Sequence, residues 1–240
     1  MTLQESFVDY RDGDLACRGL VMRDATQTAP RPGIVMFPDA RGIGDTARAY
    51  ARRLTERYVV FIADLYGEGL FTNDIARARE LMTALRSDVE RWRERARAAL
   101  EAVAHQRAVD PTKLAAIGYC FGGTTALELG RSGADMAAIV SFHGGLASPR
   151  PQDAAHLKAR VLACHGGADP LVPPAQVTEF VSHMSRAPVD WELQVYARAL
   201  HAFTNPELAA SAPPGHGYDA AADERSRRAM AALLDEVFGS

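Results

Sequence analysis

The sequence lacks the features that would cross-link the chain or anchor it in a membrane. Its 240 residues include only three cysteines, Cys17, Cys120 and Cys164, an odd number placed far apart. They cannot form a disulfide framework, and their spacing is unlike that of a zinc site. No stretch approaches the roughly 18 apolar residues of a membrane span, and the N-terminus lacks the basic and apolar regions of a secretory signal. We therefore expect a cytoplasmic protein of a reducing compartment, with no membrane partner.

An excess of positive charge is also missing. Lysine and arginine number 27 against 30 aspartates and glutamates, which gives a net charge of −3. This balance argues against a nucleic-acid partner, because nucleic-acid surfaces are strongly basic. The sequence has no His-Glu-x-x-His, no Gly-Lys-Ser phosphate loop and no dinucleotide fingerprint, so we expect no metal, nucleotide or other cofactor. Oligomeric state is left open, with a monomer slightly favoured.

Short apolar runs alternate with helix-length stretches from residue 30 onwards. Continuous apolar runs of this length are typical of strands that are covered on both faces, as in a parallel sheet. The alternation predicts a single α/β domain over residues 1–240, with a mostly parallel, doubly wound sheet, helices on both faces and no separate lid domain. The predicted strands are 34–37, 59–63, 114–117, 138–142, 161–164 and 191–196.

Three further segments have clear local patterns. Residues 7–22 indicate a hairpin around Asp12-Gly13, and residues 219–238 indicate a closing helix with Asp219 as N-cap. In residues 88–106 an apolar stripe runs along one helix face. The arginines around it, including Arg93 and Arg95, alternate with glutamates, so we interpret them as a solvated face rather than an anion-binding surface.

Cys120 lies in the segment Gly118-Tyr119-Cys120-Phe121-Gly122, between a predicted strand and a predicted helix. This Gly-x-Cys-x-Gly pattern has the form of a nucleophile elbow, with sulfur in place of the usual serine oxygen. The two glycines avoid a collision across the tight turn. The start of a helix favours a thiolate, and the N–H of Phe121 would face a developing oxyanion. The alternative is a buried cysteine beside a glycine-rich packing turn.

Two later strand ends supply partners for this cysteine. Asp169 follows the fifth predicted strand in a Gly-rich turn, and His201 follows the sixth. The chain order Cys120, Asp169, His201 matches the order nucleophile, acid, base of α/β-hydrolases. Taken singly, Asp169 could be a turn residue and His201 a loop histidine. Because all three occur in the right order and register, we predict a catalytic triad.

Four segments of the sequence together resemble the dienelactone hydrolase family: 63–66 (Ala-Asp-Leu-Tyr), 118–123 (Gly-Tyr-Cys-Phe-Gly-Gly), 165–169 (His-Gly-Gly-Ala-Asp) and 201–203 (His-Ala-Phe). The resemblance extends over nearly the whole chain. It implies an α/β-hydrolase fold, a Cys-His-Asp triad, attack of the thiolate on an ester or enol-lactone carbonyl, and no cofactor. It also assigns a second oxyanion donor to the N–H of Ala40.

The same resemblance points to residues around the substrate. The family has a glutamate where this sequence has Asp39, one methylene shorter, which is alternatively a turn residue. Of the two arginines that hold a substrate carboxylate in the family, one matches Arg79 or the nearby Arg77. The other position is Asn205, so the carboxylated dienelactone is expected to be a poor substrate. The predicted substrate-binding residues are Asp39, Tyr66, Arg79, His143, Phe203 and Asn205, with a structural role left open for His143.

We therefore predict a carboxylic-ester hydrolase that cleaves an ester or lactone of a small molecule through an acyl-enzyme. The alternatives are an acyl transferase, or a non-hydrolytic thiol or binding protein on the same fold. Cys164 is expected to be a buried core residue.

Overall fold

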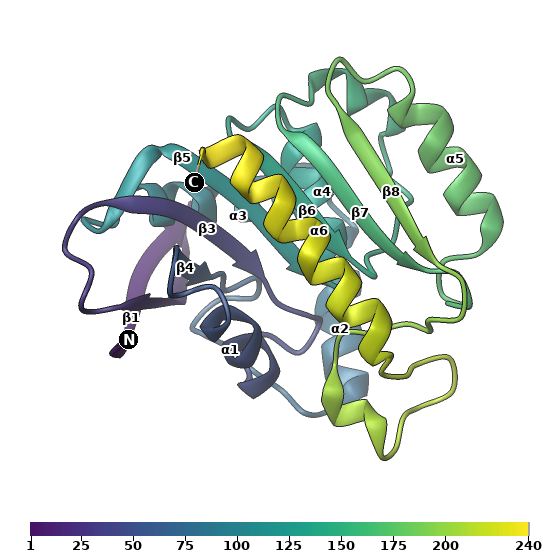
Figure 1. The fold of residues 1–240 in the computed structure, drawn as a ribbon, viewed down its shortest axis with the longest axis horizontal. Coiled ribbons are helices and arrows are strands. Elements are labelled where there is room, and N and C mark those ends of the chain that lie inside the picture. The colour runs from purple at the N-terminus through teal and green to yellow at the C-terminus, as the bar shows by residue number, and fades with distance from the viewer. Residues whose placement is uncertain (240) are drawn as a thin grey trace. The chain divides into compact units, whose positions relative to one another are not determined.

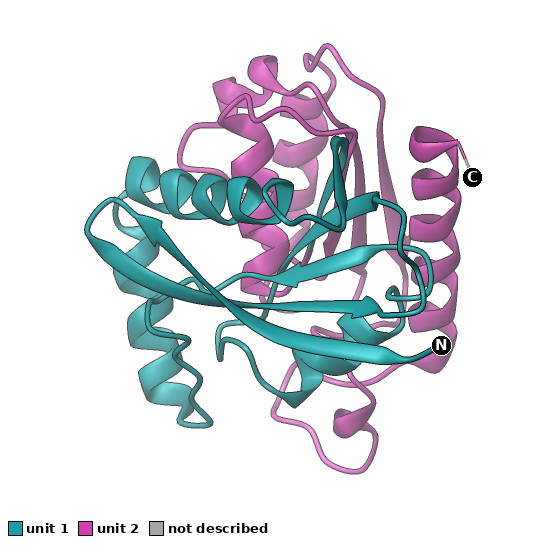
Figure 2. Cartoon of the chain, turned by 90° about the vertical axis from the view of Figure 1, so that its left-hand side faces the viewer, with its two compact units in different colours: residues 1–117 teal, residues 118–240 magenta. Residues whose placement is uncertain are grey.

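The computed structural model describes residues 1–239, which form two compact units, Met1–Ile117 and Gly118–Ser240 (Figure 2). The boundary between the units falls near the end of β5 (Val109–Tyr119), between Ile117 and Gly118, and so shortly before Cys120. We describe each unit by itself. The sequence-based expectation of one domain over the whole chain stays a prediction.

The first unit begins with the predicted hairpin. Strands β1 (Leu3–Asp12) and β2 (Leu15–Asp24) pair antiparallel, and Gly13 takes a positive φ of 55° in the turn between them. β2 then pairs antiparallel with β4 (Val59–Ile62), which lies parallel to β3 (Arg31–Phe37). The strand order in this unit is β1-β2-β4-β3-β5. The predicted strands 34–37 and 59–63 are completely buried, as their continuous apolar runs indicate.

Three helices belong to this unit: α1 (Asp45–Arg52), α2 (Ile75–Arg86) and α3 (Val89–Ala104). Asp74 and Asp88 cap α2 and α3, because each carboxylate accepts hydrogen bonds from two backbone N–H groups of the first turn. The apolar stripe predicted for α3 is confirmed: Trp92, Ala96 and Val103 are among its buried residues. The helix therefore packs by the face that the sequence pattern indicates.

The interpretation of the basic side of α3 was wrong for two residues. Arg93 and Arg95 are buried, although Arg91 and Arg97 are exposed as expected. The guanidinium of Arg95 donates from Nε to Asp12 Oδ2 at 2.5 Å and from Nη1 to Leu65 O at 2.8 Å. A buried charge needs such partners, and the partner carboxylate comes from a hairpin 83 residues away in sequence.

The second unit contains three parallel strands in the order β6-β7-β8: β6 (Ala138–Phe142), β7 (Arg160–Gly166) and β8 (Trp191–Tyr196). The helix α4 (Phe121–Arg131) packs on β6, whereas α6 (Ala220–Phe238) packs on β6 and β7, as the yellow helix in Figure 1 shows. As predicted, Asp219 caps α6 by accepting from the N–H groups of Ala221 and Ala222. The remaining elements are η1 (Pro151–His156), α5 (Pro174–Met184) and η2 (Pro206–Ala209).

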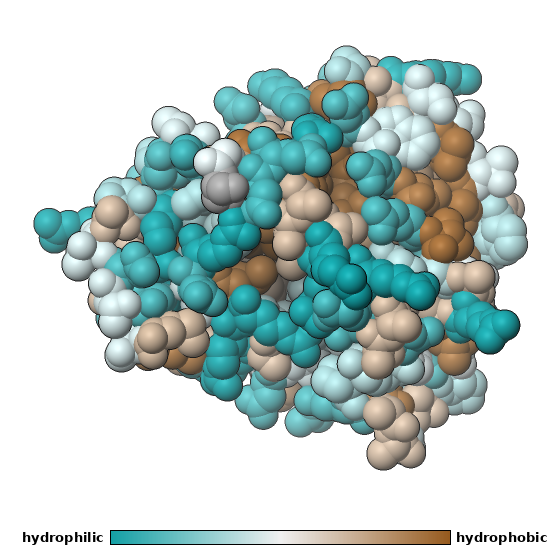
Figure 3. Space-filling model, in the orientation of Figure 1, coloured by the Kyte–Doolittle hydropathy of each residue, from teal (hydrophilic) through white to brown (hydrophobic). Residues whose placement is uncertain are grey.

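The surface of the second unit reflects this packing. In Figure 3 the outer side of α6 is mainly hydrophilic, and hydrophobic side chains gather beside it over β7 and β8. Among residues 1–239, no helix combines the length and the apolar character that a membrane crossing requires. The strands end in turns that carry Cys120, His143, Asp169 and His201, so the carboxyl ends of these strands position the site.

Candidate active site

Cys120 occupies the turn between β5 and α4 in a strained backbone conformation, with φ 53° and ψ −120°. A Cβ atom built on Gly118 would lie 1.9 Å from the carbonyl oxygen of Gly122. The turn is therefore open only to glycine at position 118, as the elbow pattern predicts. Strain of this kind is kept only where the surroundings enforce it, and it is concentrated at functional sites.

Asp169 lies in the turn that follows β7 and is buried. Its Oδ1 accepts a hydrogen bond from the N–H of Leu171 at 2.8 Å, which fixes the carboxylate within its own turn. Its Oδ2 lies 2.8 Å from Nδ1 of His201. One oxygen thus holds the side chain in place, and the other oxygen is available to the imidazole.

His201 follows β8, and both its backbone N–H and its carbonyl oxygen are hydrogen-bonded. Its N–H donates to Gly215 O, and its carbonyl accepts from the N–H of Gly217, each at 3.0 Å. The next residue, Ala202, has a positive φ of 58°, which is unusual for a residue with a side chain. On the far side of the ring, Nε2 lies 3.1 Å from Sγ of Cys120. A continuous chain of contacts therefore runs from Asp169 through His201 to Cys120.

The pKa values of His201, Cys17 and Cys164 are all raised, but for different reasons. Burial opposes the charged form of His201, but the hydrogen bonds to Asp169 and Cys120 outweigh it and raise the pKa to about 10. Burial raises the pKa of Cys17 to about 11 and that of Cys164 to about 12. The thiols of Cys17 and Cys164 therefore stay protonated at neutral pH, and both residues are only 2% exposed. This burial was expected for Cys164.

Four predicted site residues belong to the first unit. Asp39 accepts hydrogen bonds at Oδ1 from the N–H of Arg41, at 2.9 Å, and also pairs with the Arg41 guanidinium. Tyr66 donates its hydroxyl to Ala40 O at 2.9 Å, so it braces the loop that holds the predicted oxyanion donor. Arg79 is exposed on α2, whereas Arg77 is paired with Glu80 at 2.7 Å. Their predicted roles toward a substrate stay predictions.

The other four predicted residues belong to the second unit. Phe121 is buried in the first turn of α4, and Phe203 is 0% exposed between the rings of His143 and Tyr196. The carbonyl oxygen of the Asn205 side chain caps η2 by accepting from the N–H of Glu207 at 3.0 Å. His143 contacts the backbone of Cys120, where its Nδ1 lies 3.1 Å from the amide nitrogen. Asn205 and Phe203 thus have structural roles that the sequence did not indicate.

Asp64 belongs to the 63–66 motif and was not predicted to be a site residue, yet it organises a whole loop. The buried carboxylate accepts four backbone N–H groups: those of Tyr66 and Gly67 at Oδ1, and those of Arg18 and Gly69 at Oδ2. The distances lie between 2.7 and 3.0 Å. An aspartate directly after a buried strand and followed by glycines was the available signal.

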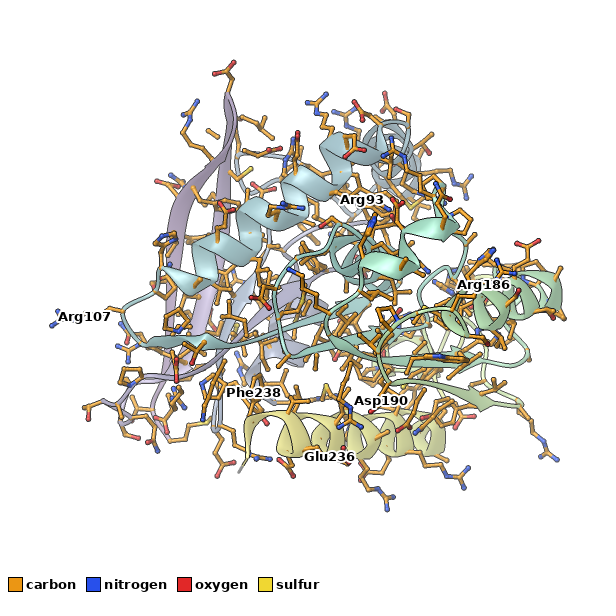
Figure 4. All side chains as sticks on the ribbon, turned by 90° about the horizontal axis from the view of Figure 1, so that it is seen from above. Arg93, Arg107, Arg186, Asp190, Glu236 and Phe238 are labelled. Carbon is orange, nitrogen blue, oxygen red and sulfur yellow. The ribbon has the colours of Figure 1, made fainter. Side chains whose placement is uncertain are left out.

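A groove of about 320 Å³ also lies in the second unit, between β7, β8 and α6. Its acidic residues Asp190 and Glu236, both labelled in Figure 4, pair with Arg160 of β7. None of Cys120, Asp169 and His201 lines it. Within residues 1–239, no group of three or more His, Cys, Asp or Glu side chains is arranged to hold a metal ion.

The strand–helix alternation, with a cysteine at a strand-to-helix elbow, defines an enzyme of the α/β-hydrolase fold. The sequence model of the dienelactone hydrolase family matches residues 17–238, and the chain belongs to this family. This membership makes the protein a carboxylic-ester hydrolase and confirms both the predicted fold class and the resemblance.

Solved structures and curated proteins agree with this assignment. The chain is 43% identical to m3DLH, with a TM-score of 0.94, and the match covers 99% of this chain and 100% of that one. A dienelactone hydrolase-like promiscuous phosphotriesterase from metagenomic libraries is 40% identical, with the same TM-score and coverage. A Yersinia pestis protein named "Putative carboxymethylenebutenolidase" is 27% identical, over 73% of this chain and 70% of its own length.

Proposed function

We propose that Cys120, His201 and Asp169 act as nucleophile, base and acid in the hydrolysis of small-molecule esters or lactones. The observation that carries this proposal is the chain of contacts, 2.8 Å from Asp169 Oδ2 to His201 Nδ1 and 3.1 Å from His201 Nε2 to Cys120 Sγ. Both distances suit proton transfer through an oriented imidazole. The membership of the dienelactone hydrolase family supports the same chemistry.

In the first half-reaction His201, whose pKa is raised to about 10, holds the proton of the Cys120 thiol on Nε2, and the thiolate attacks the carbonyl carbon of the ester. Asp169 keeps the proton on Nδ1 and balances the imidazolium. The tetrahedral intermediate collapses as the C–O bond breaks, and His201 protonates the leaving alkoxide. In a lactone this alcohol stays attached to the acyl group. The product of the half-reaction is a thioester on Cys120.

In the second half-reaction His201 deprotonates a water molecule, which attacks the thioester carbonyl. The C–S bond breaks, the carboxylic acid leaves, and the Cys120 thiolate beside the protonated His201 is restored. For the oxyanion of both intermediates we propose the N–H of Phe121, in the first turn of α4. The N–H of Ala40 is the proposed second donor, an assignment that rests on the family resemblance.

Selective alkylation tests the nucleophile. One equivalent of iodoacetamide is expected to abolish the hydrolysis of aryl esters and to label Cys120 ahead of Cys17 and Cys164, because the latter two thiols are buried with raised pKa values. Peptide mass mapping locates the label, and Cys120→Ala is the inactive control. Labelling of Cys17 with activity retained would contradict the triad.

Rapid-mixing kinetics separate hydrolysis from the alternative of acyl transfer. A hydrolase releases alcohol steadily and turns over in water alone. An acyl transferase is expected to release one equivalent of alcohol per Cys120 in a burst and then to wait for a second nucleophile. Restoration of turnover by an added thiol or alcohol acceptor would favour the transferase.

Phosphotriester cleavage is a second candidate activity, because the 40% identical relative is named as a promiscuous phosphotriesterase. The Cys120 thiolate would attack phosphorus, expel an aryloxide that His201 protonates, and leave a thiophosphoryl bond for water to cleave. An aryl phosphotriester assayed beside the matching aryl carboxylic ester checks this. Parallel loss of both activities in Cys120→Ala is expected if one nucleophile serves both.

Substrate charge is the finer part of the proposal. Asn205 takes the place of an arginine that the family resemblance implies, so only Arg79 or Arg77 remains for a substrate carboxylate. A charge-assisted hydrogen bond contributes roughly 1.5–3 kcal/mol. We expect a neutral ester to be preferred over a carboxylated dienelactone by about tenfold or more in kcat/KM. A preference for the carboxylated lactone would contradict this part alone.

A further inference from the structure

His143 lies directly after β6 and is held in an uncommon environment. Its side chain is 2% exposed, and its backbone has a positive φ of 41°. Its own N–H donates to Cys164 O at 2.8 Å, which fixes the peptide to the neighbouring strand β7. A positive φ is uncommon for a residue with a side chain. The surrounding contacts therefore hold His143 in this backbone conformation.

Both ring nitrogens of His143 have defined partners. The amide N–H of Cys120 is shared between Phe142 O at 3.0 Å and Nδ1 of His143 at 3.1 Å. Because an amide nitrogen can only donate, Nδ1 must carry the lone pair. The proton of the neutral ring is then on Nε2, which donates to Oγ1 of Thr204 at 2.8 Å. The partners therefore select one tautomer.

The ring also lies beside the base. Its centroid is 5.3 Å from that of His201, in an edge-to-face arrangement, and 5.3 Å from that of Phe203. The ring centroid of Tyr119 lies 6.1 Å from that of His143. Burial, and next the charge of His201, hold the pKa of His143 well below its usual range. His216 also lowers the pKa, and two further titratable residues, Tyr119 and Cys120, contact His143.

We propose that His143 is a positioning residue, an imidazole that anchors the strained Cys120 amide and packs against His201, so that Sγ and Nε2 stay in contact. This role rests on the proposed function, since it matters only if Cys120 is the nucleophile. The sequence left open whether His143 contacts the substrate or has a structural role. Because protein atoms engage both ring nitrogens, we favour the structural role. Small misplacements of reacting groups cost on the order of 10²-fold in rate.

Two variants of His143 distinguish anchoring from bulk. In His143→Asn the amide oxygen can accept the Cys120 N–H in place of Nδ1, and asparagine tolerates a positive φ. We expect this variant to keep kcat within about threefold. His143→Leu fills similar space without an acceptor, and we expect kcat to fall roughly 30-fold or more with KM nearly unchanged.

The rate of alkylation of Cys120 by iodoacetamide across pH is the readout that a merely structural role would not move. We expect His143→Leu to slow this reaction at neutral pH and His143→Asn to restore it. If His143→Leu does not fold, Thr204→Val tests the same tautomer without changing the backbone, with an expected loss of about three- to tenfold in kcat. In the wild type, ¹⁵N NMR should find the His143 proton on Nε2 from about pH 6 to about pH 9.

Three results would overturn the proposal: a folded His143→Leu with wild-type kcat and alkylation rate, an equal loss in the Asn and Leu variants, or a proton on Nδ1. Equal loss would mean that the imidazole itself is needed. A failure of the proposed function is seen separately, because Cys120→Ala would then retain activity whatever His143 does.

Discussion

Each compact unit buries one aspartate in the turn that follows a strand, and the two carboxylates are used differently. In the first unit Asp64 follows β4, and all four of its hydrogen bonds come from backbone N–H groups. In the second unit Asp169 follows β7, and its Oδ2 accepts from the side chain of His201. A carboxylate saturated by backbone donors organises a loop, whereas one that leaves an oxygen to an imidazole can support proton transfer.

The units also differ in where the backbone is strained. Among residues 1–239, four residues other than glycine have positive φ, and three of them, Cys120, His143 and Ala202, belong to the second unit. One is the proposed nucleophile, one contacts its amide, and one follows the proposed base. The fourth, Glu68, lies in the loop that Asp64 organises. Strained residues are thus concentrated around the proposed triad, as backbone strain commonly is at functional sites.

The largest expected effect is the difference in kcat between variants of the two aspartates. Asp169→Asn should lower kcat on the order of 10³-fold, because the amide cannot hold His201 in the right tautomer or balance its charge. Its circular dichroism spectrum should match that of the wild type, which separates the loss of kcat from a loss of fold. Asp64→Asn, measured on the same aryl ester, should keep kcat within about threefold for the folded protein. A large loss of kcat in Asp64→Asn with an intact fold would break the comparison.

The next effect is on stability and falls on Asp64. In Asp64→Asn one amide nitrogen would face backbone N–H groups that now bond to an oxygen. Each buried donor left without a partner costs roughly 1–3 kcal/mol, so we expect the free energy of unfolding to fall by about 2–4 kcal/mol in urea titrations. Asp9→Asn is the matched control, since that carboxylate only pairs with Arg18 on the surface and should change little. Equal stability of the two variants would contradict the organising role of Asp64.

The third effect is a pH dependence of stability that His201, in the second unit, should contribute. The pKa of His201 is raised to about 10 in the folded chain, above its value in an unfolded chain. The stability linked to its protonation is therefore complete below about pH 6.5 and is lost as the pH rises through about 10. Compared with His201→Gln, the unfolding free energy of the wild type should fall by up to about 1.4 kcal/mol per pH unit in that window.

The control for this measurement is Asp169→Asn, which removes one of the two hydrogen bonds that raise the pKa and should reduce the slope. An identical pH profile for the wild type and His201→Gln would mean that His201 titrates near its ordinary value. The proposed pairing of the imidazole would then need revision.

The smallest effect concerns the strain after the base. Ala202 has a positive φ, which costs a residue with a side chain about 1 kcal/mol. Ala202→Gly should therefore leave stability unchanged or raise it by up to about 1 kcal/mol. Ala84→Gly, at an exposed position inside α2, should lower it by about 1 kcal/mol. If both substitutions destabilise equally, the loop of the second unit stores no strain at position 202.

Much of the architecture follows from local sequence. The buried strands, the Asp12-Gly13 hairpin and the cap Asp219 all depend on residues next to one another in the chain, and the structure confirms them. The elbow around Cys120 is equally local, because the collision that Gly118 avoids is with Gly122. The order of Cys120, Asp169 and His201 was enough to predict that the three side chains would meet.

Only the tertiary structure decided which polar side chains are buried and what they contact. Arg95 finds Asp12 across 83 residues, and His143 finds the Cys120 amide across 23. Nothing near Arg95 in the sequence distinguishes it from its solvated neighbours, and nothing near His143 selects its tautomer. Turns and caps are fixed by adjacent residues, whereas the partner of a buried charge or ring nitrogen comes from whichever strand the fold brings alongside. For that reason Asp64 and Asp169 look alike in sequence and differ in the folded chain.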